Sequence, residues 1–206
     1  MTQRITRQDW ERVAAGFRSL GYLRHNQRRQ EHLAALGLDL VDKTVLELGA
    51  GVGDHTTFFL DRGCTVTAVE PRLECCQFLL ESYKNAHYTA PVKLKLLNID
   101  VESLPAHVTE RFDIVYCYGL LYHVADPARV ITLMAERCAG VGLIASPAPI
   151  VTAVSSSRTP AHVEFPDDWT GPPPADRMTR AVFVAARHPL GLSTLLDHLP
   201  DRQPKP

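Results

Sequence analysis

Apolar and polar positions follow two different periods along the chain. Apolar residues recur every three or four positions over residues 6–20 and 25–38, which predicts two amphipathic helices, with Gly37 as a stop for the second. Short runs rich in β-branched residues predict strands at 44–48, 65–69, 92–99, 112–118, 141–146 and 181–186. Helix-length stretches lie between strands, at 54–62, 72–84 and 126–138. This alternation predicts an α/β fold with a mostly parallel sheet and helices on both faces.

The last third of the chain departs from this alternation. Seven prolines lie between Pro147 and Pro174, so that stretch cannot form a regular helix, and residues 150–154 ("IVTAV") are its strand candidate. We therefore expect one domain over residues 1–206. It would comprise a helical cap (1–40), a ligand-binding core (41–146), and a proline-rich loop, last strand and tail (147–206).

Composition narrows the function classes. A chain of 206 residues suits a single domain, and a net charge of −1 gives no basic footprint for nucleic acid. The cluster of Arg24, Arg28 and Arg29 is typical of a solvated helix face. The charged N-terminus does not resemble a signal peptide, and no long apolar stretch predicts a membrane span. Five cysteines without C-x-x-C and nine scattered histidines favour neither a disulfide framework nor a metal site, so we expect a cytoplasmic protein without a metal.

The stretch "VLELGAGVGDHTTFF" (45–59) places a glycine turn after the first predicted strand. A dinucleotide site requires a third glycine in G-x-G-x-x-G, but counting from Gly49 that position is Asp54, and from Gly51 it is Thr56. An acidic residue at the helix start also repels a pyrophosphate. The turn therefore indicates a ligand without phosphate and disfavours a nicotinamide oxidoreductase; the alternative is a tight turn that binds nothing.

Polar residues at later strand ends agree with a nucleoside ligand. Glu70 follows the second strand about twenty residues after the first glycine, where a carboxylate can accept both ribose hydroxyls. Asp100, after the third strand, is placed to accept from an exocyclic amine, and Val101 to contact an adenine face. The fourth strand runs into the polar and aromatic stretch "YCYGLLYHVADP". Each residue alone is a common turn former, but their order along the chain predicts one cleft.

The set "VLELGAGVGD", "VTAVEP", "NIDVESL" and "FDIVYCYGLLYHVADP" resembles the motif series of class I S-adenosylmethionine-dependent methyltransferases, from about Lys43 to Ser146. "YLRHNQRRQEHLAALGLDL" with "GDHTTFF" resembles a small bacterial subgroup of that family without an assigned substrate. The resemblance implies a Rossmann-like, seven-stranded sheet with an antiparallel late strand, two extra N-terminal helices, and S-adenosylmethionine as cofactor. The family normally has a further helix and strand where this chain is short and proline-rich. The cofactor-binding residues expected are Glu47, Gly49, Ala50, Gly51, Gly53, His55, Glu70, Pro71, Asp100, Val101, Cys117, Tyr118 and Gly119.

Methyl transfer to oxygen or nitrogen needs a base, and His123, four residues after Gly119, is the catalytic candidate because histidine titrates near neutral pH. The alternative is that His123 packs or hydrogen-bonds the amino-acid end of the cofactor. A roof over the cleft is expected from the N-terminal helices and from the loop bearing Phe165 and Trp169, whose aromatics could equally anchor that loop. The candidate substrate residues are Tyr22, His25, Arg28, Tyr122 and Trp169.

Two functions follow from these expectations. The first is methyl transfer to an oxygen or nitrogen atom of a small-molecule acceptor. The second is a catalytically weak S-adenosylmethionine-binding partner or sensor, suggested by the shortened final third. A second copy of the chain could complete the roof, which would make the functional unit a homodimer.

Overall fold

The computed structural model describes residues 6–86, 93–147, 162–165 and 180–186. The helices are α1 (Arg7–Gly16), α2 (Leu20–Ala35), α3 (Asp54–Leu60), α4 (Leu73–Asn85) and α5 (Pro127–Arg137), with 3₁₀ turns η1 (Val101–Ala106) and η2 (Leu121–His123). The strands are β1 (Thr44–Leu48), β2 (Thr65–Val69), β3 (Leu94–Leu97), β4 (Phe112–Tyr118), β5 (Cys138–Pro147), β6 (His162–Phe165) and β7 (Arg180–Ala186).

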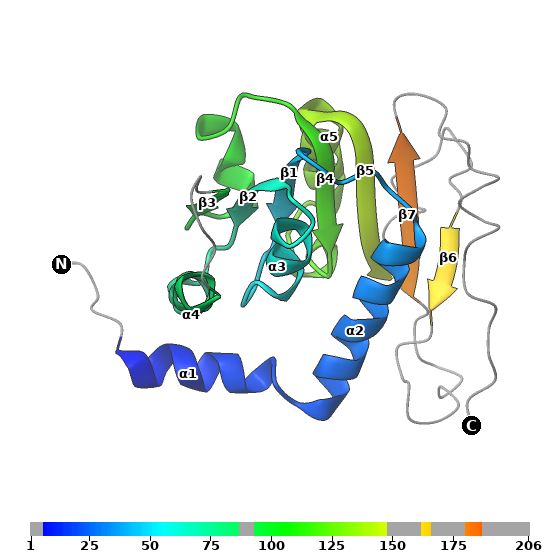
Figure 1. Cartoon of the computed structure of the whole chain (residues 1–206). Coiled ribbons are helices and arrows are strands. Elements are labelled where there is room, and N and C mark those ends of the chain that lie inside the picture. Colours follow the sequence, from blue (N-terminus) through cyan, green and yellow to red (C-terminus); the bar gives the residue numbers. More distant parts are fainter. Residues whose placement is uncertain (1–5, 87–92, 148–161, 166–179, 187–206) are drawn as a thin grey trace, which may run out of the picture.

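The strands form one sheet in the order β3-β2-β1-β4-β5-β7-β6 (Figure 1). Strands β1 to β5 are parallel, β7 is antiparallel to β5, and β6 is antiparallel to β7. This arrangement confirms the predicted Rossmann-like α/β fold with an antiparallel late strand. The chain order reverses between β1 and β4, and in such sheets ligands bind beyond the carboxyl ends of the strands at this point.

The final third corrects one sequence-based expectation. Residues 162–165 pair with β7 as strand β6, although they lie in the stretch predicted as a proline-rich loop. The flanking prolines, Pro160 and Pro166, fall just outside the strand, and prolines are tolerated at the ends of an edge strand. The strand candidate at 150–154 lies outside the described residues, as does the rest of the predicted loop.

Two hydrophobic clusters hold the sheet between its helices. Val45 of β1 packs in one cluster with Phe59 of α3, whereas Leu46 belongs to the other cluster with Met134 of α5. Successive residues of a strand point to opposite faces, which explains why neighbours on β1 join different clusters. Both faces of the central strands are therefore buried, as expected of a parallel sheet.

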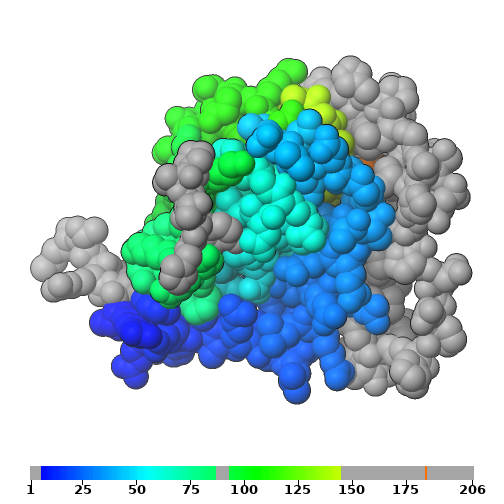
Figure 2. Space-filling view, in the orientation of Figure 1, coloured from blue at the N-terminus to red at the C-terminus, as the bar shows by residue number. Residues whose placement is uncertain are grey.

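Helices α1 and α2 lie at the end of the sheet where β4 and β5 have their carboxyl ends (Figure 1). A capping box begins α1: the Asp9 amide donates to Thr6 Oγ1, and the Thr6 amide donates to Asp9 Oδ2 at 3.0 Å. The Trp10 ring packs edge-on against that of Phe78 of α4, with 5.7 Å between the ring centroids. Figure 2 shows the blue residues of this N-terminal cap lying against the cyan and green residues of the core. No helix within the described ranges is both long and apolar enough to cross a bilayer.

Candidate functional site

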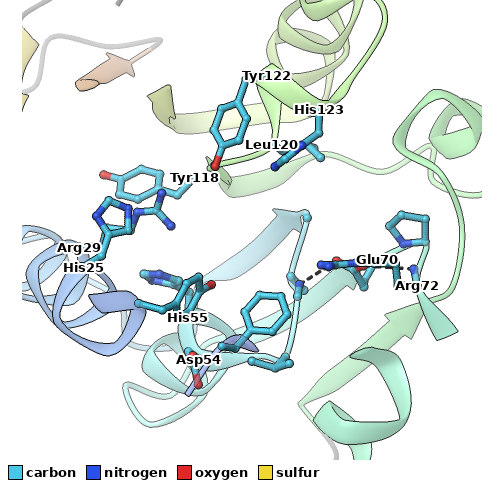
Figure 3. Close-up of a pocket in the computed structure, with 18 residues that line it drawn as sticks. His25, Arg29, Asp54, His55, Glu70, Arg72, Tyr118, Leu120, Tyr122 and His123 are labelled. Carbon is cyan, nitrogen blue, oxygen red and sulfur yellow. Dashed lines mark hydrogen bonds and ion pairs between the residues drawn. The ribbon is translucent and has the colours of Figure 1, made fainter. Parts of the chain in front are cut away.

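A cavity of 520 Å³ opens at the carboxyl ends of β1, β2 and β4, beneath the α1–α2 cap (Figure 3). Many of the residues selected from the sequence line it together. They are Tyr22, His25, Gly49, Ala50, Gly51, His55, Glu70, Pro71, Tyr118, Gly119, Tyr122 and His123. The cavity volume is typical of small-molecule sites.

The glycine turn forms the floor of the cavity. The Gly49 and Ala50 amides donate to the Val69 carbonyl at 2.9 and 3.1 Å, which holds the turn against the end of β2. Gly51 has a φ of +57°, and a Cβ placed on it would lie 3.3 Å from Phe17 Cε1. Since the turn carries no side chains at Gly49 and Gly51, a ligand can approach its backbone closely.

Glu70 stands at the end of β2 with its carboxylate already oriented. Oε2 accepts from the Gly51 amide at 2.8 Å, and Oε1 accepts from the Arg72 amide at 3.1 Å and from Arg72 Nε at 2.6 Å. The side-chain amide of Asn98, the residue after β3, donates to the Glu70 and Pro71 carbonyls and also fixes this strand end. Hydrogen bonding to Glu70 raises the pKa of the Arg72 guanidinium. The carboxylate is thus fixed at the wall, and about one of its four lone-pair sites remains for a ligand.

Two polar groups are buried beneath the turn. Glu47 is 2% exposed, accepts from Thr56 Oγ1 at 2.6 Å, and does not line the cavity; burial raises its pKa to about 8. His55 does line the cavity, and its Nδ1 lies 2.8 Å from the Tyr116 hydroxyl. Burial lowers the pKa of His55 well below its ordinary value, so the ring is neutral. Its Nε2 is buried and has no hydrogen-bond partner among the residues that the structure describes.

The segment after β4 forms the opposite wall. Tyr118 lines the cavity, whereas Cys117 points to the other face of the sheet and is fully buried in the core. His123 lies in η2 at the cavity mouth, exposed, with its ring 4.2 Å from that of Tyr122. In Figure 3 Tyr122 and His123 face the side of the cavity that holds His25 and Arg29. The candidate base is therefore at the cavity, with access to solvent.

Several residues expected at the site do not line it. Asp100 is exposed, Val101 is buried in the core at 5% exposure, and Gly53 meets Leu79 of α4 rather than the cavity. Glu47 and Cys117 are likewise outside the lining, and Trp169 lies outside the described residues. Gly53, Asp100 and Val101 follow strands, and the direction of the chain there, which strand periodicity does not specify, decides where they lie. Glu47 and Cys117 lie within β1 and β4 and are buried there.

Arg28, a candidate substrate residue, also lies away from the cavity. It is exposed and pairs with Glu31 at 3.1 Å, while the neighbouring Arg29 lines the wall. One position along a helix turns a side chain by about 100°, so the cluster of arginines on α2 divides between solvent and cavity. The residues that the sequence reasoning missed are Phe17, Arg29, Val52, Asp54, Arg72 and Leu120. The available signals were Arg72, two residues after Glu70, and the apolar Val52 and Leu120, each next to a predicted site glycine.

Comparison with known proteins agrees with this fold. The profile of a methyltransferase domain family matches residues 46–145. A ubiquinone biosynthesis O-methyltransferase of Pseudomonas fluorescens (strain Pf0-1) is 36% identical over 98 residues, which is 46% of this chain and 39% of that protein. The corresponding protein of Azotobacter vinelandii is 34% identical over 106 residues, 50% of this chain and 40% of that protein. The chain thus spans about two fifths of the length of these relatives.

Two solved structures share the fold across most of the chain. The N-methyltransferase NodS from Bradyrhizobium japonicum WM9, in complex with S-adenosyl-L-homocysteine, superposes with a TM-score of 0.61 at 17% identity, covering 86% of this chain and 96% of that one. Magnesium protoporphyrin IX methyltransferase from Synechocystis PCC 6803 gives 0.62 at 12% identity, covering 91% and 90%.

Sheet order, glycine turn and strand-end carboxylate together define a Rossmann-like methyltransferase fold. Together with the match of the methyltransferase-domain profile to residues 46–145, they support a class I S-adenosylmethionine-dependent methyltransferase.

Proposed function

We propose that the protein transfers the methyl group of S-adenosylmethionine to an oxygen atom of a small-molecule acceptor. The observation that carries this proposal is the pairing of Glu70 with the Gly51 amide at the end of β2. It brings a fixed carboxylate and a bare glycine turn to the same wall, which suits the ribose diol of a nucleoside without phosphate. The absence of the third dinucleotide glycine argues against a pyrophosphate ligand.

Arg72 must share Glu70 with this ligand. Three donors already bond the Glu70 carboxylate, which offers about four lone-pair sites. A ribose with two hydroxyls therefore takes the remaining site and replaces the Arg72 Nε bond. The Arg72 side chain is 51% exposed, so it can turn to solvent at low cost.

When bound, S-adenosylmethionine supplies a sulfonium methyl group that is already activated for displacement. The chain contributes alignment of the acceptor and exclusion of water, which the cap residues Tyr22 and His25 supply over the cavity. His123 accepts the acceptor's proton at the cavity mouth. A role for His123 in packing against the ligand is the alternative, and the two make different kinetic predictions.

We prefer oxygen over nitrogen as the methylated atom because the relatives at 34–36% identity are named as O-methyltransferases, whereas the N-methyltransferase NodS is 17% identical. Their names concern ubiquinone biosynthesis, and this chain spans only 39–40% of their length, so their substrate is not carried over. A catalytically weak binding partner or sensor remains the second candidate, with the exposed setting of His123 as the observation that favours it.

Calorimetry and a turnover assay test the proposal. S-adenosylmethionine and S-adenosylhomocysteine should bind, and NAD should not; binding of NAD alone would contradict the assignment. With labelled S-adenosylmethionine and a panel of phenolic acceptors, we expect transfer to oxygen. Binding without turnover across phenol and amine acceptors would favour the sensor.

The His123→Gln variant tests the base. Turnover should fall by about a hundredfold or more, while affinity for S-adenosylhomocysteine is unchanged, because a base acts only in the transition state. His107→Gln, an exposed histidine that does not line the cavity, is the matched control. Loss of affinity at an unchanged saturated rate would instead support the packing role.

A further inference from the structure

Asp54, the first residue of α3, receives three polar contacts from the N-terminal cap. Its Oδ2 accepts from Asn26 Nδ2 at 2.7 Å, and its backbone carbonyl accepts from Gln30 Nε2 at 2.8 Å. Its Oδ1 lies 3.6 Å from Nη2 of Arg18, which precedes α2. Asn26 and Gln30 are four positions apart, so they project from the same face of α2. Asp54 thus binds two successive turns of α2 and the corner that leads into it.

The contact between Asp54 and Asn26 is largely withdrawn from water. Asn26 is 4% exposed, and the Asp54 side chain is 18% exposed. Burial raises the pKa of the Asp54 carboxyl, against the opposing effects of Arg18 and Asn26. A buried carboxylate is costly unless it accepts hydrogen bonds, so Asp54 depends on the donors that the cap supplies.

The amide of Asn26 has its orientation fixed by Asp54. Nδ2 faces the carboxylate, whereas Oδ1 is buried with no partner within the described part of the chain. The flipped amide would set two oxygen atoms against one another. A hydrogen bond to a carboxylate is stronger than one between neutral groups, so the bond to Asp54 offsets the cost of the unpartnered oxygen.

The residues beside these two donors line the cavity. His25 precedes Asn26, Arg29 precedes Gln30, and both His25 and Arg29 belong to the lining. Figure 3 draws these two side chains together where α2 meets the cavity. An α-helix turns by about 100° per residue, so fixing positions 26 and 30 against α3 also fixes the direction in which positions 25 and 29 project.

We propose that Asp54 is a positioning residue that sets the rotation of α2 and thereby directs the side chains of α2 into the cavity. It acts through Asn26 and Gln30, and not through contact with the ligand. The effect on ligand affinity rests on the proposed function, whereas the hold on α2 is measurable in the free protein.

Exchange of the two side chains tests this role. Asn26→Asp sets two carboxylates against one another, so it should weaken S-adenosylhomocysteine binding and speed amide hydrogen exchange in residues 20–35, each by about tenfold or more. Asp54→Asn should lose less, because the new amide oxygen still accepts from Asn26. In the double variant that carries both changes, an amide and a carboxylate face one another again. Most of both losses caused by Asn26→Asp should therefore be recovered.

Direct contact between Asp54 and the ligand would give a different pattern. Asn26 does not line the cavity, so a carboxylate moved to that position cannot replace one that touches the ligand. A large loss of affinity in Asp54→Asn that the double variant does not repair would overturn the positioning role. Gln27→Met, at an exposed position of α2 outside the lining, is the control and should change neither measurement.

The melting temperature of each variant checks its folding. If Asn26→Asp does not fold, Gln30→Met takes its place, because it removes the donor to the Asp54 carbonyl and keeps a side chain of similar length. Gln30→Met should speed exchange in residues 20–35 by about fivefold, and unchanged exchange would overturn the proposal. If the wild-type protein does not bind S-adenosylhomocysteine, the proposed function fails, and amide exchange in the free variants decides the role of Asp54 by itself.

Discussion

At the scale of single residues, the Glu70 carboxylate is shared between a backbone amide and an arginine, and the proposed function adds a ribose. Charge-assisted hydrogen bonds are worth about 1.5–3 kcal/mol, so Glu70→Ala should weaken S-adenosylhomocysteine binding by roughly ten- to a hundredfold. Glu110→Ala, an exposed carboxylate before β4 at the other end of the sheet, should have no effect in the same calorimetric titration. Equal affinities for the Glu70→Ala and wild-type proteins would remove Glu70 from the binding site.

The second residue-scale prediction concerns Glu47, whose pKa is raised to about 8 from an ordinary value of 4.5 by burial, against the opposing hydrogen bond from Thr56. Between about pH 4.5 and 8 the unfolded chain loses this proton while the folded protein keeps it. Wild-type stability should therefore fall with rising pH across that window, by up to about 1.4 kcal/mol per pH unit from this group.

Glu47→Gln removes this titration and retains an acceptor for Thr56. The free energies of unfolding of the variant and the wild type are measured by urea titration from pH 5 to 8. The value for the variant minus that for the wild type should increase as the pH rises. Other titrating groups cancel in the difference; one is His32, whose pKa burial lowers to about 4. A stability difference that does not change with pH would mean that Glu47 is ionised in the folded protein.

At the scale of elements, Gly53 decides how α3 meets α4. It is the N-cap of α3 with a φ of +89°, and a Cβ there would overlap Leu79 Cδ1 of α4. Gly53→Ala should cost about 2–4 kcal/mol of unfolding free energy, since both the backbone conformation and the packing oppose a side chain. Gly16→Ala, at the end of α1 with nothing within 4 Å of the new methyl group, is the control and should be neutral or slightly stabilising. Equal stability of the two variants in urea would show that α4 moves aside freely.

At the scale of the whole molecule, the cavity joins the N-terminal cap to the sheet. Phe17 follows α1, Tyr22 and His25 belong to α2, and all three line the same cavity as the strand ends. Binding of S-adenosylhomocysteine should therefore slow amide hydrogen exchange in residues 17–35 as well as in the glycine turn. Helix α5 packs in the hydrophobic cluster that contains Leu46 and Met134, and it lines no part of the cavity. Amide hydrogen exchange in α5 should therefore not change. Unchanged protection of residues 17–35 would mean that the cap takes no part in binding.

Much of the site was predictable because its residues lie next to strand ends in the chain. Glu70 and the glycine turn follow directly from the strands at 65–69 and 44–48, and parallel strands bring such ends to one edge. Asp100 satisfied the same rule and yet is exposed, because the chain turns into η1 immediately after it. Whether a strand-end residue faces the cavity depends on the direction of the turn that follows, and local pattern does not specify that direction.

Hydrophobic periodicity by itself determined the elements of the core: each buried strand and helix of residues 44–147 was predicted to within a few positions, because burial of a face imposes its period on the sequence. Only the tertiary structure decided which arginine of α2 enters the cavity, and that residues 162–165 form an edge strand. The first depends on the rotation of α2 about its axis, which its packing on the core sets. The second depends on the presence of β7 as a partner. The sequence of a strand does not by itself show which other strand it will pair with.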